Sequence, residues 1–123
     1  MFLSENRLHL TIIDKSNISP LNSIGQVIRK CRESKGLLLR QVAAALDMDT
    51  ALLSKIERDE RKPNKKQVIA LAKYFNVNVD EFLIAWLSDK IANEVQNEEL
   101  AKEALKEAEK KVELHKKKNG NRD

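Results

Sequence analysis

The sequence contains four small or basic residues whose spacing suits contact with another molecule: Thr50, Ala51, Ser54 and Lys55. They lie in the stretch 48–61, MDTALLSKIERDER, which runs from an acidic residue through an apolar stripe into charge. If this stretch is helical, the four residues share one face of the helix. An exposed helix face normally carries large polar side chains, but the first turn here exposes only a threonine and an alanine. So small a surface favours close contact with a binding partner.

No set of residues in the sequence offers catalytic chemistry. There is no nucleophile beside a base, no glycine-rich phosphate loop and no pair of carboxylates that helical spacing would bring together. His9 and His115 are isolated, and no cluster of Cys or acidic residues has the spacing of metal ligands. We therefore expect a protein that is not an enzyme and that uses no cofactor, metal or small-molecule ligand.

Two short helices joined by a turn at residues 47–49 would position the four residues of the stretch 48–61 that are named above. The segment 37–47, LLLRQVAAALD, has an apolar face and a small residue, Ala43, where two helices should cross. Asp49 is a suitable N-cap for the helix that follows. This spacing is typical of a helix-turn-helix, whose second helix lies in the major groove of DNA. Its first residues would then meet the bases, and residues one turn later would reach base edges or the adjacent backbone.

Apolar residues at helical spacing extend over most of the remaining sequence, which has only three Gly and two Pro among its 123 residues. Further helices are predicted over about 22–36, 64–76, 78–96 and 97–117, the last three capped by Asn64, Asn78 and Asn97. The predicted core residues of the central helices are Ile24, Val27, Ile28, Cys31, Leu39, Val42, Ala43, Leu46, Leu52, Leu53, Ile56, Val68, Leu71, Ala72 and Phe75. The fold class expected is therefore all-α.

Composition divides the sequence into four parts. They are a flexible leader at 1–21, a helix-turn-helix domain at 22–80, C-terminal helices at 81–118 and a frayed tail at 119–123. The leader holds the only β-like stretch, LHLTIIDKS. That stretch is either disordered or paired with its copy in a dimer, since a single strand is not stable alone. The longest apolar run, FLIAWL, is far shorter than the roughly 20 residues that span a membrane.

The stretch KGLLLRQVAAALDMDTALLSKIERDERKPNKKQVIALAKYFNVNVDEFL carries a family likeness, most of it in SKIERDERKP and LAKYFNVNVDE. Residues 23–83 resemble the Cro/cI-type (Xre) helix-turn-helix family. The resemblance implies a five-helix, lambda-repressor-like DNA-binding domain, here followed by a C-terminal helical extension. Short family members with such an extension resemble restriction-modification controller proteins.

The resemblance assigns roles to individual residues. Base-facing positions of the family are matched by Thr50, Ala51, Ser54 and Lys55. A loop that contacts the DNA backbone is matched by Arg58, Arg61 and Lys62. Arg32 and Glu57 match a structural ion pair that joins the first helix of the domain to the third.

This sequence departs from the family at three places. The family usually begins its second helix with Thr or Ser and then Gln, which contacts phosphate, but here the residues are Leu38 and Leu39. We expect Arg40 to supply the missing contact. Asp47 in the turn and Asp59 after IER stand where the family usually has Gly. Asp tolerates the positive φ that these positions imply, at some cost in stability.

Basic residues concentrate in the region expected to bind DNA. Residues 22–66 hold eleven Lys or Arg and six Asp or Glu, a net charge of +5, against +4 for the whole chain. Phosphate contacts give salt-sensitive binding that is independent of sequence, so specificity must come from the helix that begins at residue 50. The residues expected to contact the DNA backbone are Arg40, Arg58, Arg61, Lys62 and Lys65.

The C-terminal third is expected to hold the dimer interface. Residues 82–87 are apolar all round, so one face should close the domain core and the other should meet a second subunit. Apolar residues at heptad spacing follow in the last helix. The interface residues expected are Trp86, Leu87, Leu105 and Val112, although Trp86 also suits a place in the core.

Together these features predict a sequence-specific transcription regulator. We expect it to be cytoplasmic and to bind double-stranded DNA as a homodimer at an inverted repeat. The resemblance suggests restriction-modification genes as its targets. The alternative is an antitoxin-like interaction module that binds another protein through its C-terminal helices.

Overall fold

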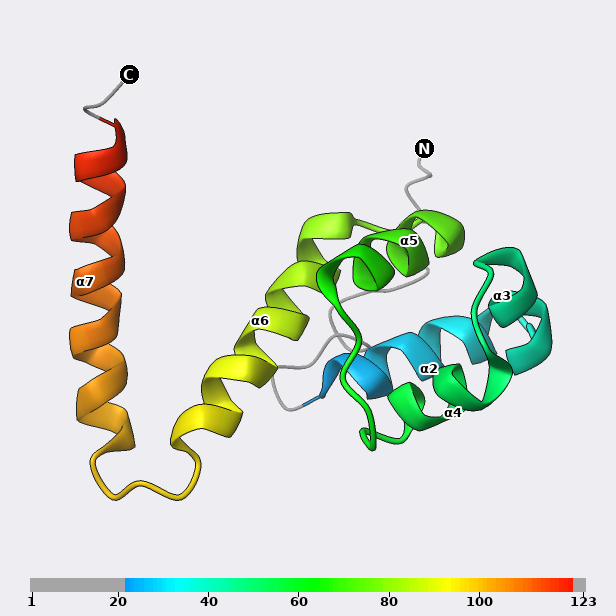
Figure 1. Ribbon diagram of the computed structural model, residues 1–123, viewed down its shortest axis with the longest axis horizontal. Coiled ribbons are helices and arrows are strands. Elements are labelled where there is room, and N and C mark those ends of the chain that lie inside the picture. The colour runs from blue at the N-terminus through cyan, green and yellow to red at the C-terminus, as the bar shows by residue number, and fades with distance from the viewer. Residues whose placement is uncertain (1–21, 121–123) are drawn as a thin grey trace, which may run out of the picture. The chain divides into compact units, whose positions relative to one another are not determined.

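A computed structural model describes residues 22–120 of the protein, so the expected leader with its β-like stretch and the last residues of the tail lie outside the described part. Within that part all regular structure is helical, as expected, and there is no strand. The helices are α2 (Ile24–Ser34), α3 (Leu39–Ala45), α4 (Thr50–Glu57), α5 (Lys65–Phe75), α6 (Val79–Val95) and α7 (Ala101–Gly120) (Figure 1). No helix within residues 22–120 is long and apolar enough to cross a membrane.

The chain forms two compact units. The first unit extends to Lys90 and contains α2 to α5 with most of α6, and the second begins at Ile91 and contains α7. The first unit thus continues past residue 80, where the sequence predicted the end of the domain. The reason is that Phe82, Ala85 and Trp86 are buried in its core.

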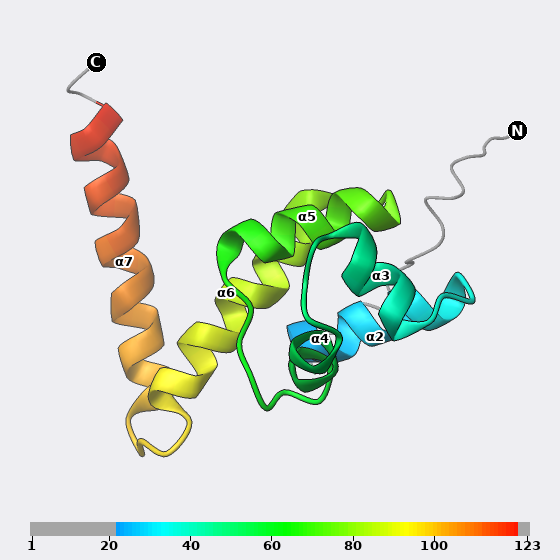
Figure 2. The same cartoon turned by 45° about the vertical axis from the view of Figure 1, so that its right-hand side comes forward.

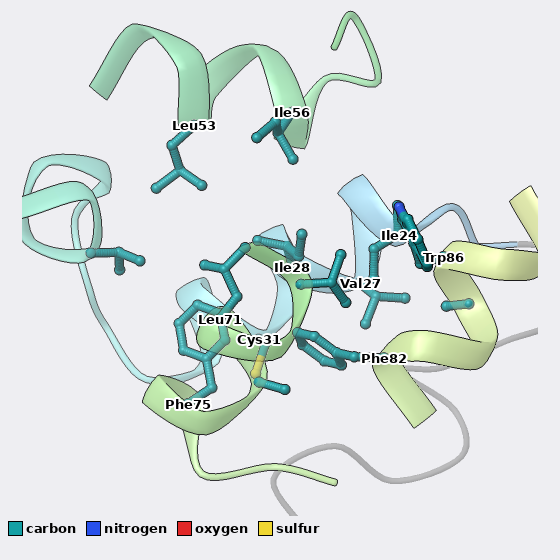
Figure 3. Close-up of a cluster of buried hydrophobic side chains, with 14 of the residues drawn as sticks. Ile24, Val27, Ile28, Cys31, Leu53, Ile56, Leu71, Phe75, Phe82 and Trp86 are labelled. Atoms are coloured by element: carbon teal, nitrogen blue, oxygen red, sulfur yellow. The ribbon is translucent and has the colours of Figure 1, made fainter. Parts of the chain in front are cut away.

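One hydrophobic core holds the first unit together. Side chains from α2, α4, α5 and α6 converge on it (Figure 3). Phe75 and Phe82 pack edge to face, with ring centroids 6.4 Å apart. The predicted stripe of α2, Ile24, Val27, Ile28 and Cys31, is entirely buried. Burial of such side chains is the main stabilising contribution in a domain of this size.

Local side-chain caps fix where most of the helices begin. Ser23 and Gln26 form a reciprocal capping box at the start of α2, and Asn64 and Gln67 form another at α5. The Asn78 side chain accepts the Glu81 N–H at 3.0 Å, just before α6 begins. These contacts confirm the predicted caps at Asn64 and Asn78.

The predicted cap at Asn97 is wrong. The Glu98 N–H donates to the Val95 carbonyl at 2.9 Å, so the chain is still turning out of α6 at this point. Helix α7 begins only at Ala101, with a hydrogen bond from the Ala104 N–H to the Leu100 carbonyl at 2.9 Å. It then continues to Gly120, beyond its expected end near Lys117.

Candidate nucleic-acid interface

A tight turn joins α3 to α4 and sets the direction of α4. Asp47 has a φ of 55°, and the Met48 N–H donates to the Ala43 carbonyl at 2.8 Å. Ala43 is fully buried, and its small side chain allows the two helices to pack closely. The Asp49 side chain accepts the Ala51 N–H at 2.8 Å and caps α4, as predicted. Helix α4 also packs against α2, beside which it is seen nearly end-on (Figure 2).

Helix α4 presents the predicted reading residues on the face opposite the core. Leu53 and Ile56 point into the core and are buried. Thr50, Ala51 and Lys55 are exposed, and Ser54 is half-buried. Among the described residues, neither the Thr50 hydroxyl nor the Lys55 ammonium has an ion-pair or hydrogen-bond partner, so both remain available to a ligand. We call Thr50, Ala51, Ser54 and Lys55 the reading face.

The loop after α4 folds back on the end of that helix. The N–H groups of Glu60 and Arg61 both donate to the Lys55 carbonyl, at 2.8 and 3.3 Å. This reversal requires a φ of 64° at Asp59, the position where the family usually has Gly. The expectation that Asp adopts a positive φ at both departures is therefore confirmed. The fold-back places the backbone of this loop, residues 58–63, which we call the basic loop, next to the last turn of α4.

Two residues near the start of α2 hold this loop in place. The Ser23 hydroxyl donates to the Asp59 carboxylate at 2.8 Å. A side chain at Gly25 would collide with the Ile56 carbonyl and the Asp59 carboxylate, so glycine allows α2 to approach the end of α4. Sequence reasoning missed both roles, because the contacts cross more than 30 positions. The only local signal was the capping pattern of Ser23 and Gln26.

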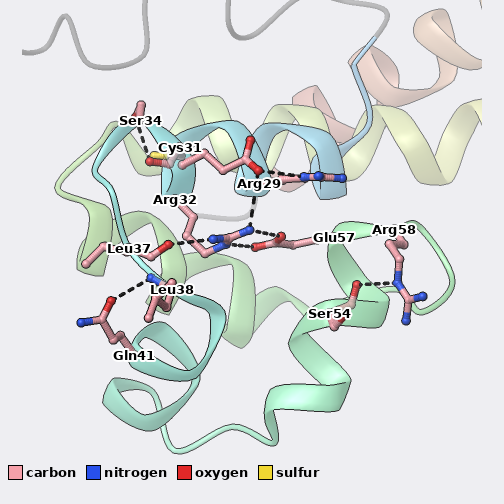
Figure 4. Close-up of polar contacts among 11 residues, drawn as sticks. Arg29, Cys31, Arg32, Ser34, Leu37, Leu38, Gln41, Ser54, Glu57 and Arg58 are labelled. Carbon is pink, nitrogen blue, oxygen red and sulfur yellow. Dashed lines mark hydrogen bonds and ion pairs between the residues drawn. The ribbon is translucent and has the colours of Figure 1, made fainter.

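The five residues expected to contact the DNA backbone are all exposed: Arg40, Arg58, Arg61, Lys62 and Lys65. Arg58 differs from the others because its Nε donates to the Ser54 carbonyl at 3.3 Å (Figure 4) and its Nη1 lies 3.4 Å from the Glu60 carboxylate. Its charge is partly neutralised by that acidic neighbour. At the start of α3, Leu38 is 48% exposed and has no polar side-chain atom to offer a phosphate. Arg40 remains the predicted substitute.

A buried ion pair joins α2 to α4 behind the reading face. The Arg32 Nε and Nη2 donate to the two Glu57 oxygens at 2.8 and 3.0 Å, and Nη1 donates to the Leu37 carbonyl at 2.7 Å (Figure 4). Hydrogen bonding to Glu57 raises the pKa of the Arg32 guanidinium. The predicted structural pair is thus confirmed, and it also holds the segment that leads into α3.

Helix α6 makes two further long-range contacts that sequence reasoning did not foresee. The Trp86 Nε1 donates to the Pro63 carbonyl at 2.8 Å, at the end of the basic loop. The Asp89 carboxylate accepts the Ile24 N–H at 2.8 Å, at the start of α2. Burial raises the pKa of Asp89, and the hydrogen bond from Ile24 partly opposes that rise. Both contacts fix α6 to the segments that position α4.

The match to known families falls on this part of the chain. Residues 28–82 match the family described as Helix-turn-helix (HTH_3), and no curated protein or solved structure matches the chain. The chain therefore contains a helix-turn-helix domain of the Cro/cI (Xre) type in a lambda-repressor-like fold, with C-terminal helices beyond it. A domain of this type implies DNA binding and is typically not enzymatic. The narrower likeness to controller proteins stays a prediction.

Proposed function

We propose that the protein is a sequence-specific transcription regulator that binds an inverted-repeat operator as a homodimer. The observation that carries the proposal is the reading face of α4, which is small, exposed and flanked by a basic loop. A small first turn allows a helix to enter the major groove, and a thymine methyl suits contact with an alanine such as Ala51. The basic loop supplies the phosphate contacts that orient the helix.

The two kinds of contact are separated by a pair of substitutions, Lys55→Ala and Arg61→Ala. We expect Lys55→Ala to lose about 1–3 kcal/mol of discrimination at one base pair in each half-site. We expect Arg61→Ala to weaken binding to all sequences about equally and to reduce the salt dependence. Both residues are exposed, so neither change should unfold the domain. The measurement is affinity, at several salt concentrations, for duplexes that the protein selects from a random pool and for single-base variants of them.

Both variants serve as controls for each other in that experiment. Lys55 lies on the reading face and Arg61 lies on the basic loop. The two are close, because the Arg61 N–H donates to the Lys55 carbonyl. If both substitutions weaken selected and random DNA to the same extent, base reading does not reside in α4.

Exposed apolar residues on α6 support the homodimer. Ile84, Leu87 and Ile91 are 65%, 49% and 51% exposed and lie three and four positions apart on one face, which we call the α6 stripe. Trp86, by contrast, is only 8% exposed and its Nε1 donates to the Pro63 carbonyl, so it belongs to the core and its expected place in the interface is wrong. Leu87 remains a proposed interface residue, as do Leu105 and Val112 on α7.

The α6 stripe is tested by the substitution Leu87→Glu. We expect the dimer to weaken at least about tenfold in sedimentation, because an unpaired carboxylate is costly to bury in an apolar contact. Operator affinity should fall with it, since a single helix-turn-helix contacts only one half-site. The control is Asn93→Glu, an exposed position on the opposite side of α6. A Leu87→Glu protein that dimerises as strongly as this control rules out the α6 stripe as the interface.

The choice of target genes rests on the resemblance alone. We propose restriction-modification genes, and a selected sequence found upstream of such genes would support this choice. A chain that stays monomeric and instead binds a different protein through its C-terminal helices would favour the antitoxin-like alternative.

A further inference from the structure

Helix α7 carries an apolar stripe that its own unit leaves exposed. The helix has 20 residues, which corresponds to a length of about 30 Å. Its stripe residues lie four, three and four positions apart, the spacing of a coiled coil: Ala101, Leu105, Ala108 and Val112. Leu105 is 40% exposed and Val112 is 61% exposed. We call these four residues the α7 stripe.

Charges beside the α7 stripe disfavour a parallel pair of such helices. Lys102, Glu109, Lys111 and Lys116 occupy the positions that flank an interface of this kind. In a parallel pair, Lys111 would face Lys116 of the partner subunit, and the symmetry of the pair would repeat this repulsion on the other side. Lys118 would add a further positive charge at the same end.

An antiparallel pair removes the repulsion and creates complementary contacts. With Leu105 opposite Ala108 of the partner subunit, Lys102 faces Glu109 of the partner subunit, and symmetry provides the same ion pair twice. Neither Lys102 nor Glu109 has an ion pair among the described residues, whereas Glu107 pairs with Lys110 at 3.2 Å. The two flanking charges are thus available for contact between helices.

The same charges also select the register. A shift of one heptad would place Glu109 opposite Glu109 of the partner subunit and Lys102 opposite a lysine, so like charges would meet. In the favoured register every layer pairs a large with a small side chain: Leu105 with Ala108, and Val112 with Ala101. Such alternation lets two helices pack closely without voids.

We propose that α7 pairs antiparallel with α7 of a second copy of this chain, with Ala101 opposite Val112 of the partner subunit. This pairing rests on the proposed homodimer and adds the orientation and register of its C-terminal helices. Its test involves no DNA and no change in α6. The stripe is only two heptads long, so α7 adds to the association made elsewhere instead of replacing it.

Disulfide formation between Ala101→Cys and Val112→Cys variants of the full chain distinguishes the orientations. Equal positions lie about 16 Å apart along the axis of an antiparallel pair, because eleven residues separate them at 1.5 Å each. A disulfide needs Cα atoms within about 7 Å. We expect a cross-link in a mixture of the two variants and none in either variant alone. The native Cys31 is buried and its pKa is raised to about 12, so it does not compete if thiols are alkylated before unfolding.

The other outcomes overturn the proposal. Cross-links in each variant alone indicate a parallel pair, and their absence from the mixture indicates a solvated helix or a different partner. A dimer that persists in sedimentation without a cross-link leaves the proposed function intact and rejects only the pairing of α7.

A charge exchange provides a second test in the cysteine mixture. Glu109→Lys should lower the cross-link yield several-fold, and Lys102→Glu combined with Glu109→Lys should restore it, because the ion pair is re-formed with reversed sign. The matched control is Glu103→Lys, which changes the charge equally on the side of α7 away from the stripe. If the control and Glu109→Lys lower the yield alike, the effect is one of overall charge and the proposed register is wrong.

Discussion

Replacing Arg32 by alanine is expected to lower the free energy of unfolding by about 3–5 kcal/mol, the usual cost of removing one partner from a buried ion pair. The side chains of Arg32 and Glu57 are only 12% and 3% exposed, so the substitution leaves the Glu57 carboxylate inside the protein without its donors. The Leu37 carbonyl loses a donor as well. For a domain of this size the melting midpoint should fall by more than about 12 °C in a thermal scan.

The chain provides a matched control one turn earlier in the same helix. Arg29 pairs with Glu33 at 3.2 Å, but these side chains are 57% and 53% exposed. An exposed pair of this kind contributes about 0–1 kcal/mol, so Arg29→Ala should hardly change the midpoint. Replacing both members of the buried pair by apolar residues, Arg32→Met with Glu57→Leu, should recover much of the loss. Equal effects of Arg32→Ala and Arg29→Ala would contradict the structural role of the buried pair.

Trp86→Ala is expected to destabilise the protein by about 3–5 kcal/mol, the range for truncating a large aromatic side chain in a core. Trp86 is 8% exposed, so the substitution leaves a cavity between α6 and the rest of the first unit. It also removes the donor to the Pro63 carbonyl and the ring over which the Lys90 ammonium lies at 4.2 Å. Chemical denaturation at several protein concentrations measures the loss.

Trp86→Phe separates packing from hydrogen bonding. The phenyl ring retains most of the buried surface but leaves the Pro63 carbonyl without its donor, at a cost of about 1–3 kcal/mol. If Trp86 belonged to a dimer interface, the losses would instead appear mainly as weaker association. A Trp86→Ala chain that keeps its unfolding free energy but becomes monomeric would therefore place this residue in the dimer interface.

Local signals predicted the helices of the first unit well. The caps Asp49, Asn64 and Asn78 act within three residues of their position, so a pattern along the sequence is enough to find them. The apolar stripe of α2 could be predicted because a helix repeats every 3.6 residues whatever surrounds it. The structure buries the whole stripe. Asp47 and Asp59 were identified by comparison with the glycines of the family, and both have the expected positive φ.

Long-range contacts explain what the sequence did not reveal. Three contacts join residues far apart in the sequence: Trp86 with Pro63 (23 positions), Asp89 with Ile24 (65 positions) and Ser23 with Asp59 (36 positions). No periodicity connects residues at such distances, so the place of Trp86 in the core was left undecided. The predicted start of the last helix failed for a local reason instead. Asn97 is a good capping residue, but the turn that closes α6 already uses the neighbouring Glu98 N–H.

The candidate site follows from the sequence in part. Periodicity and the family resemblance predicted which residues of α4 turn away from the core, and the structure places Thr50, Ala51 and Lys55 in the solvent. The way in which the loop folds back onto the Lys55 carbonyl was not predictable, because it depends on backbone hydrogen bonds and on the anchoring of Asp59 by Ser23. The roles of these residues on DNA remain predictions.

Selection of duplexes from a random pool by the purified full chain tests the central claim most directly. We predict that the selected sequences share an inverted repeat whose half-site centres lie about 10–10.5 base pairs, or about 34 Å, apart, the spacing at which two recognition helices read one side of a duplex. Affinity for these duplexes should exceed that for scrambled ones by about 10³-fold or more at physiological salt. A pool without any enriched motif, with equal affinity for selected and scrambled DNA, would contradict the account.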